Sequence, residues 1–134
     1  MFPANNQLEE VLLKVVTLNH LYGTGILATS KVAEHIYHLN IDSKIHNGQP
    51  EAVHLIAKVQ LGKQIRNNYS FATKYCAWHN PNGFPIYDNY VDQMLWGYAK
   101  QDHFEPFKRL DLWNYGSFQK IILRFLDYYN LVSI

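Results

Sequence analysis

The sequence predicts an all-α fold, a compact single-domain bundle of about six helices over residues 1–134. Two observations predict this class. In several segments the apolar residues recur at the i, i+3, i+4, i+7 spacing of a buried helix face, and no stretch shows the sustained period-two alternation of a half-buried strand. A chain of 134 residues is also long enough to bury one hydrophobic core.

The first two expected helices flank a glycine turn. Asn6 begins the first helix and has capping-box spacing to Glu9, and Gly23 ends it because glycine accepts a left-handed conformation. The apolar face between them contains Leu8, Val11, Leu12, Val15 and Leu18. The second helix is expected over residues 26–39. The intervening Gly23-Thr24-Gly25 has the outline of a helix-hairpin-helix motif, whose backbone amides can hold a phosphate, although two glycines between helices also make an ordinary turn.

The third and fourth expected helices carry the centre of the fold. Pro50 suits the first position of the third helix, which is expected to continue through Gln60-Leu61 and to end at Gly62. The polar, basic segment 63–68 is expected to be a connector. The fourth helix is expected over residues 70–79, where a broad apolar face predicts a central position.

Two further helices are expected in the last third of the chain. Asp88 is expected to open the fifth helix as its N-cap, because its carboxylate can accept the free backbone amides. The residues expected to face inward from this helix are Val91, Met94, Leu95 and Tyr98. Residues 102–116 are irregular and aromatic-rich, and Ser117 is expected to cap the last helix.

The net charge is +1, which gives no overall electrostatic signature of nucleic-acid or membrane binding. The charges are nevertheless unevenly distributed, since no Asp or Glu lies between Ala52 and Tyr87. The cations in this interval are Lys58, Lys63, Arg66 and Lys74. The cluster has two interpretations: a chance grouping on a solvated face, or a surface that contacts phosphate.

Cys76 is the single cysteine, so no internal disulfide can form and a reducing compartment is expected. Its apolar helix predicts a small core residue rather than a nucleophile. No apolar run approaches the ~20 residues of a membrane span, and the first residues do not form a signal peptide. We therefore expect a soluble, cytoplasmic protein without a membrane partner.

No metal or cofactor is expected. The chain has seven histidines, but no His-Glu-x-x-His pattern. Cys76 and His79 have i, i+3 spacing, yet a structural zinc site needs two more ligands at recognisable spacing. Phosphate-binding P-loops, dinucleotide fingerprints and Gly-x-Ser-x-Gly elbows are also missing from the sequence.

The segment from Ser70 to Leu95 resembles the core of helix-hairpin-helix DNA glycosylases. In that family a helix, a short loop and Pro-Val-Asp precede another helix, and the Asp supports base removal. Here Pro85-Ile86-Tyr87-Asp88 is similar, with one extra residue between Pro and Asp. The resemblance thus implies that Asp88 is the catalytic residue. The stretch also resembles small uncharacterised prokaryotic proteins that share Tyr-Ser-Phe-Ala-Thr-Lys-Tyr-Cys and Pro-Ile-Tyr-Asp.

The sequence departs from the glycosylase pattern at two places. The family's glycine-rich hairpin would fall at residues 65–69, which contain no glycine. The lysine nucleophile of bifunctional members would fall at residues 68–70, where no lysine stands. The resemblance therefore implies a monofunctional or inactive relative rather than a Schiff-base lyase.

Two hypotheses of function follow. In the first, the protein is a DNA-binding, glycosylase-like protein in which the four clustered cations contact phosphate and Asp88 stabilises the developing sugar cation. The aromatic residues expected to stack on an extruded base are Tyr69, Trp78, Tyr87 and Tyr90. In the second, the protein is a non-catalytic helical domain that binds a protein partner through the apolar segment 104–113.

Overall fold

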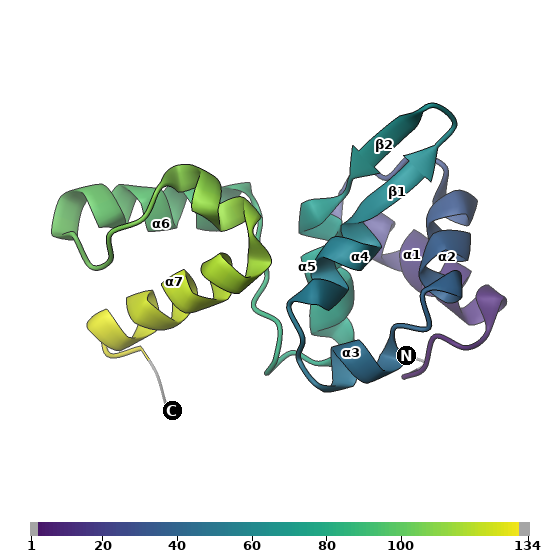
Figure 1. Cartoon of the computed structure of the whole chain (residues 1–134), viewed down its shortest axis with the longest axis horizontal. Coiled ribbons are helices and arrows are strands. Elements are labelled where there is room, and N and C mark those ends of the chain that lie inside the picture. Colours follow the sequence, from purple (N-terminus) through teal and green to yellow (C-terminus); the bar gives the residue numbers. More distant parts are fainter. Residues whose placement is uncertain (1–2, 132–134) are drawn as a thin grey trace.

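The computed structural model describes residues 3–131, which are mostly helical (Figure 1). The elements in chain order are α1 (Leu8–Tyr22), α2 (Thr29–His38), α3 (Asp42–His46), α4 (Glu51–Ala57), β1 (Lys58–Leu61), β2 (Gln64–Asn67), α5 (Tyr69–His79), α6 (Asn89–Asp102), the 3-10 helix η1 (Arg109–Trp113) and α7 (Tyr115–Tyr128). The helical prediction is confirmed. The prediction of a purely α fold is wrong, because β1 and β2 form a two-stranded sheet.

The elements gather in two groups (Figure 1). One group holds α1 to α5 and the sheet, and the other holds α6, η1 and α7. Tyr115 at the start of α7 joins them: its backbone N–H donates to Nε2 of His54 at 3.0 Å, and its hydroxyl donates to the carbonyl of Pro85 at 2.6 Å. Because Tyr115 is fully buried, the hydrophobic core continues from the first group into the second.

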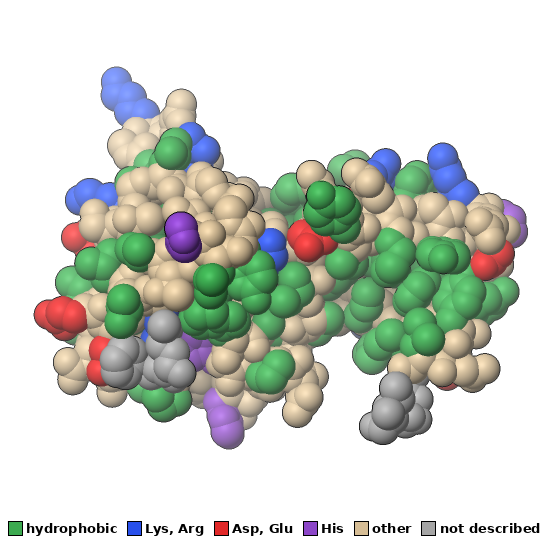
Figure 2. All heavy atoms as spheres, turned by 180° about the vertical axis from the view of Figure 1, so that it is seen from behind, with side chains coloured by type: hydrophobic (Ala, Val, Ile, Leu, Met, Phe, Trp, Pro, Cys, Tyr) green, Lys and Arg blue, Asp and Glu red, His purple; other side chains and the backbone are tan. Residues whose placement is uncertain are grey.

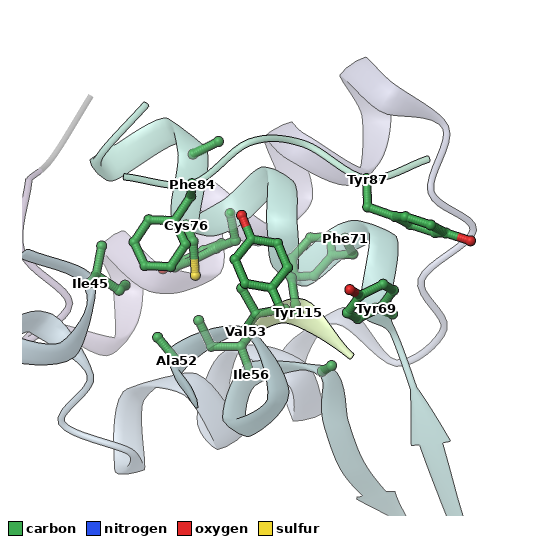
Figure 3. Close-up of a cluster of buried hydrophobic side chains, with 14 of the residues drawn as sticks. Ile45, Ala52, Val53, Ile56, Tyr69, Phe71, Cys76, Phe84, Tyr87 and Tyr115 are labelled. Carbon is green, nitrogen blue, oxygen red and sulfur yellow. The ribbon is translucent and has the colours of Figure 1, made fainter. Parts of the chain in front are cut away.

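Helix α5 is the centre of the first group. Eight of its eleven residues are buried, and Figure 3 shows Phe71 and Cys76 from this helix among the clustered side chains of the core. Cys76 has no exposed surface, and burial raises the pKa of its thiol above the ordinary value. The prediction of a central helix is confirmed, and so is the prediction that Cys76 is buried.

Strands β1 and β2 form an antiparallel ribbon where the sequence predicted helix and connector. Gly62, at φ 62°, and Lys63 make the two-residue turn between the strands. The Cα partners are Lys58↔Asn67, Val59↔Arg66, Gln60↔Ile65 and Leu61↔Gln64. The Asn68 N–H donates to the Ala57 carbonyl at 2.8 Å and closes the base of the ribbon.

Several predicted helix ends shift in the structure. Helix α1 begins at Leu8 without a side-chain cap, rather than at Asn6, and it ends at Gly23 as predicted, with φ 56°. Helix α2 begins at Thr29, three residues later than expected. Helix α7 is capped by Asn114 instead of Ser117, because Asn114 Oδ1 accepts from the Ser117 N–H at 3.0 Å.

The predicted inward face of α6 is half correct. Leu95 is buried, but Met94 and Tyr98 are 36% and 40% exposed. Asp92 is buried in their place. It can be buried because an arginine neutralises its carboxylate and a tyrosine hydroxyl donates a hydrogen bond to it. A periodicity argument counts such a charged residue as outward-facing.

Candidate nucleic-acid interface

Three of the four predicted phosphate-binding cations lie on the β1–β2 ribbon. Lys58 belongs to β1, Lys63 to the turn and Arg66 to β2, and all three are exposed. Within residues 3–131 none of the three forms an ion pair. Figure 2 shows Lys and Arg side chains projecting from the end of the molecule where the ribbon lies. In the structure these three cations therefore lie together on one exposed ribbon that has no acidic residue.

Lys74 does not join these three cations. It lies on α5 with only 7% of its surface exposed. Its ammonium lies 5.0 Å from the centroid of the Tyr22 ring, at the end of α1. A cation over an aromatic face is held by the ring quadrupole. Lys74 therefore links α5 to α1, and it is largely buried instead of lying exposed beside the other three cations.

The four aromatic residues predicted to stack on a base are not brought together on one surface. Tyr69 and Tyr87 are 1% and 3% exposed, whereas Tyr90 is 82% exposed and Trp78 is half-buried. The Tyr69 ring stacks on Trp113, with ring centroids 5.3 Å apart. Burial raises the pKa of both buried phenols. Tyr69 and Tyr87 therefore belong to the core between the two groups of helices.

Asp88 has the local geometry that the sequence predicted. It is the N-cap of α6, with Oδ1 accepting from the Val91 N–H at 2.9 Å, and it is half-buried. A second carboxylate, Asp92, lies one helical turn later. It accepts from the Tyr87 hydroxyl at 2.6 Å and from Nε of Arg109 at 2.8 Å. Sequence reasoning missed this site because Arg109 is 17 residues away on η1, with no spacing pattern to indicate the pair.

A buried polar cluster also escaped sequence analysis. The Lys14 ammonium donates to the Ala4 carbonyl at 2.6 Å, to Asn5 Oδ1 at 2.9 Å and to His79 Nε2 at 3.0 Å, which satisfies its three protons. The Asn5 backbone and side-chain amides donate to Asp42, and the Tyr75 hydroxyl donates to Asn5 Oδ1. The cluster ties the start of the chain to α3 and α5.

Burial lowers the pKa of Lys14, and nearby Asp42 partly opposes that shift. Burial also lowers the pKa of His79, whose Nδ1–H donates to the Tyr75 carbonyl at 2.8 Å. His79 is thus a neutral imidazole with both nitrogens engaged. The one signal in the sequence was a lysine placed between Val11, Val15 and Leu18 on an otherwise apolar helix face.

In residues 3–131, no three or more His, Cys, Asp or Glu side chains come together in an arrangement that could hold a metal ion. The helices found over the same range are all too short or too polar to cross a membrane.

The ribbon lies within the part of the chain that matches a known protein family. The model of the HI_0787_N family, described as an N-terminal domain, matches residues 1–83. An uncharacterized protein of Haemophilus influenzae is 42% identical over 119 residues, which are 88% of this chain. The chain spans 59% of the length of that relative. No solved structure matches. The family match contains α1 to α5 and the ribbon, and it ends before Asp88.

Proposed function

The chain belongs to the HI_0787_N family of N-terminal domains, and we propose that it binds nucleic acid through the β1–β2 ribbon. The ribbon lies within the residues that the family model matches. Residues 1–83 also hold the elements that support it, since β1 contacts both α2 and α4.

The observation that carries the proposal is the exposed, unpaired charge of Lys58, Lys63 and Arg66 on one ten-residue ribbon without an acid. A cation that is already paired in the protein gains little from a phosphate, because one ion pair replaces another. Unpaired exposed cations release counterions from nucleic acid on binding, and this release dominates non-specific affinity. Three such contacts predict that log Kd changes with log salt with a slope of about 3 in magnitude.

The experiment is a salt titration of binding to a fluorescently labelled DNA duplex. The variant Lys63→Gln/Arg66→Gln should bind at least about tenfold more weakly at low salt, with a salt slope lower by about 2. The matched control is Lys100→Gln/Lys120→Gln, which removes the same charge from exposed positions on α6 and α7. If both variants weakened binding equally, the effect would come from net charge and not from the ribbon. No binding by the parent at low salt would refute the proposal.

Base removal at Asp88 would extend this function. The resemblance to glycosylases supports it, and so does the position of Asp88 at the entrance of α6, behind Pro85. It requires a cleft that admits an extruded base, and the burial of Tyr69 and Tyr87 removes two of the expected stacking surfaces. Binding is therefore the core of the proposal, and catalysis is tested separately through Asp88.

Binding of a protein partner is the second candidate function. It is supported by Leu110 and Trp113, which lie on η1 and are 80% and 47% exposed. Figure 2 shows hydrophobic side chains gathered over the group formed by α6, η1 and α7. Exposed apolar patches of this kind often serve as protein contacts. Leu110→Ser, at the more exposed of the two positions, should weaken such an interaction and leave binding of nucleic acid by the ribbon unchanged.

A further inference from the structure

The two faces of the ribbon differ in what they contact. Directly opposed residues of an antiparallel pair point to the same face, so the pairs Val59↔Arg66 and Leu61↔Gln64 share one face. Val59 is 2% exposed, which places the β1 side of this face against the body of the protein, whereas Gln64 and Arg66 on β2 are exposed. The opposite face carries Lys58, Asn67, Gln60 and Ile65. All four are exposed, Ile65 by 69%.

The dimensions of the ribbon match one nucleic-acid groove. Strands of four residues are ~13 Å long, because each residue rises ~3.3 Å, and the two strands lie ~4.8 Å apart. The major groove of B-form DNA is about 12 Å wide and admits a two-stranded ribbon. The major groove of A-form RNA is too narrow for side chains to read. Size therefore favours duplex DNA over duplex RNA.

The composition of the ribbon disfavours single strands. Proteins that hold single-stranded nucleic acid stack its bases on aromatic side chains. Residues 58–67 contain no aromatic residue. The outer face instead offers two amides, Gln60 and Asn67, and the branched apolar side chain of Ile65. These are groups that contact base edges rather than base faces.

The chemistry of the outer face also indicates which bases it would contact. An Asn or Gln amide can donate to N7 and accept from N6–H of the same adenine, and an apolar side chain can contact the thymine methyl group. The Gln60 amide donates one proton to the Gly62 carbonyl at 2.8 Å, which leaves its oxygen and its second proton free. Lys58 lies opposite Asn67, where it can reach a phosphate beside the base that Asn67 contacts.

Given the nucleic-acid binding proposed above, on which this inference rests, we infer that the ligand is double-stranded DNA. The ribbon enters the major groove with Gln60, Ile65 and Asn67 against the base edges and Lys58 beside a phosphate, and it prefers sites that contain A·T pairs at the contacted positions.

The test begins with three labelled probes of one sequence: a 20-base-pair DNA duplex, the matching RNA duplex and the single DNA strand. The full chain should bind the DNA duplex at least about tenfold more tightly than either other probe. Selection from randomised DNA duplexes should then enrich a short site with A·T pairs. Asn67→Ala should weaken binding to that site about 5- to 150-fold, the range for one bidentate contact, while its affinity for random duplex stays close to that of the parent.

The matched control is Gln101→Ala, which removes an exposed amide from α6 and should change neither affinity. Binding of DNA duplexes without any enriched site, or tighter binding of the RNA duplex or the single strand, would overturn the inference and leave the proposed function standing. No binding of any of the three probes would overturn the proposed function itself. Circular dichroism of each variant shows whether it keeps the helical fold, so that weaker binding is not mistaken for unfolding.

Discussion

The ammonium of Lys14 lies 3.0 Å from Nε2 of His79, a residue 65 positions away in the chain. Lys14 is almost completely buried, and His79 is half-buried. A lysine ammonium can only donate, so Nε2 must be the unprotonated nitrogen of the imidazole. The contact therefore requires a neutral His79, and it makes the stability of the fold sensitive to pH.

We predict that the protein loses stability as the pH falls below about 6.5, and that His79 accounts for part of the loss. Burial lowers the pKa of His79 below its ordinary value of 6.5. The unfolded chain therefore binds a proton there before the folded chain does, and stability decreases as the pH falls through that window. In urea unfolding between pH 7.5 and 5.5, His79→Gln should flatten the profile, because a Gln oxygen accepts from Lys14 and does not titrate. His20→Gln, at an exposed position of α1, is the control and should keep the slope of the parent.

Removal of the lysine itself should be costly. Lys14→Met keeps an unbranched stem but leaves the acceptors of Ala4, Asn5 and His79 without their donor. Each buried acceptor that loses its partner costs about 1–3 kcal/mol, and relief of the buried charge offsets part of the sum. We expect a net loss of roughly 1–3 kcal/mol in urea unfolding at pH 7.5. A variant as stable as the parent would show that the cluster contributes nothing to stability.

Sequence patterns located most of the helices because long amphipathic segments have a strong period. They failed at the ribbon because strands of four residues are too short to establish alternation. Val59 and Leu61 also continue the apolar spacing of α4, so Val53, Ile56 and Val59 fit one helix face. Gly62 is equally compatible with the end of a helix and with the turn of a hairpin. The packing of Val59 against the rest of the protein favours the hairpin.

The candidate site could be predicted only in part, because some of its features are local in the sequence and others depend on how distant segments pack. Local features such as the Asp88 cap and the acid-free run of cations can be seen in sequence alone. The partners of Lys14, Asp92 and Tyr69 come from distant segments, and their burial follows from how the helices pack. The sequence alone therefore does not tell whether a cation is exposed: Arg66 is exposed on the ribbon, whereas Lys74, eight residues later, is buried with its ammonium over the Tyr22 ring.

The turn of the ribbon provides a prediction that separates the ribbon from the rest of the fold. Gly62 has φ 62°, and a Cβ built there meets nothing within 4 Å. Gly62→Ala therefore suffers backbone strain without a clash, which costs about 1–2 kcal/mol. We expect faster hydrogen exchange at the ribbon amides, unchanged protection of α5 and weaker binding to DNA. Gly97→Ala in α6, where a Cβ also meets nothing, should be neutral or slightly stabilising because it lies within a helix.

The last prediction concerns Asp88, whose two roles can be separated by one substitution. As a cap, its carboxylate accepts from the Val91 N–H. Asn caps about as well as Asp, and the lost charge–dipole attraction is only ~0.3–1 kcal/mol. Asp88→Asn should therefore melt within a few degrees of the parent and bind DNA through the ribbon as before. Asp88→Ala lacks the cap and should cost about 1 kcal/mol.

A glycosylase role would depend on the negative charge of the Asp88 carboxylate, whereas capping depends mainly on its hydrogen bond. A carboxylate that stabilises a sugar cation acts through its charge, which Asn does not carry. If the parent releases damaged bases from DNA, Asp88→Asn should reduce that release by orders of magnitude while binding persists. Borohydride should trap no covalent adduct with the parent, because residues 68–70 contain no lysine. Equal release by parent and Asn variant would leave Asp88 with the capping role alone, and a trapped adduct would require a lysine nucleophile elsewhere in the chain.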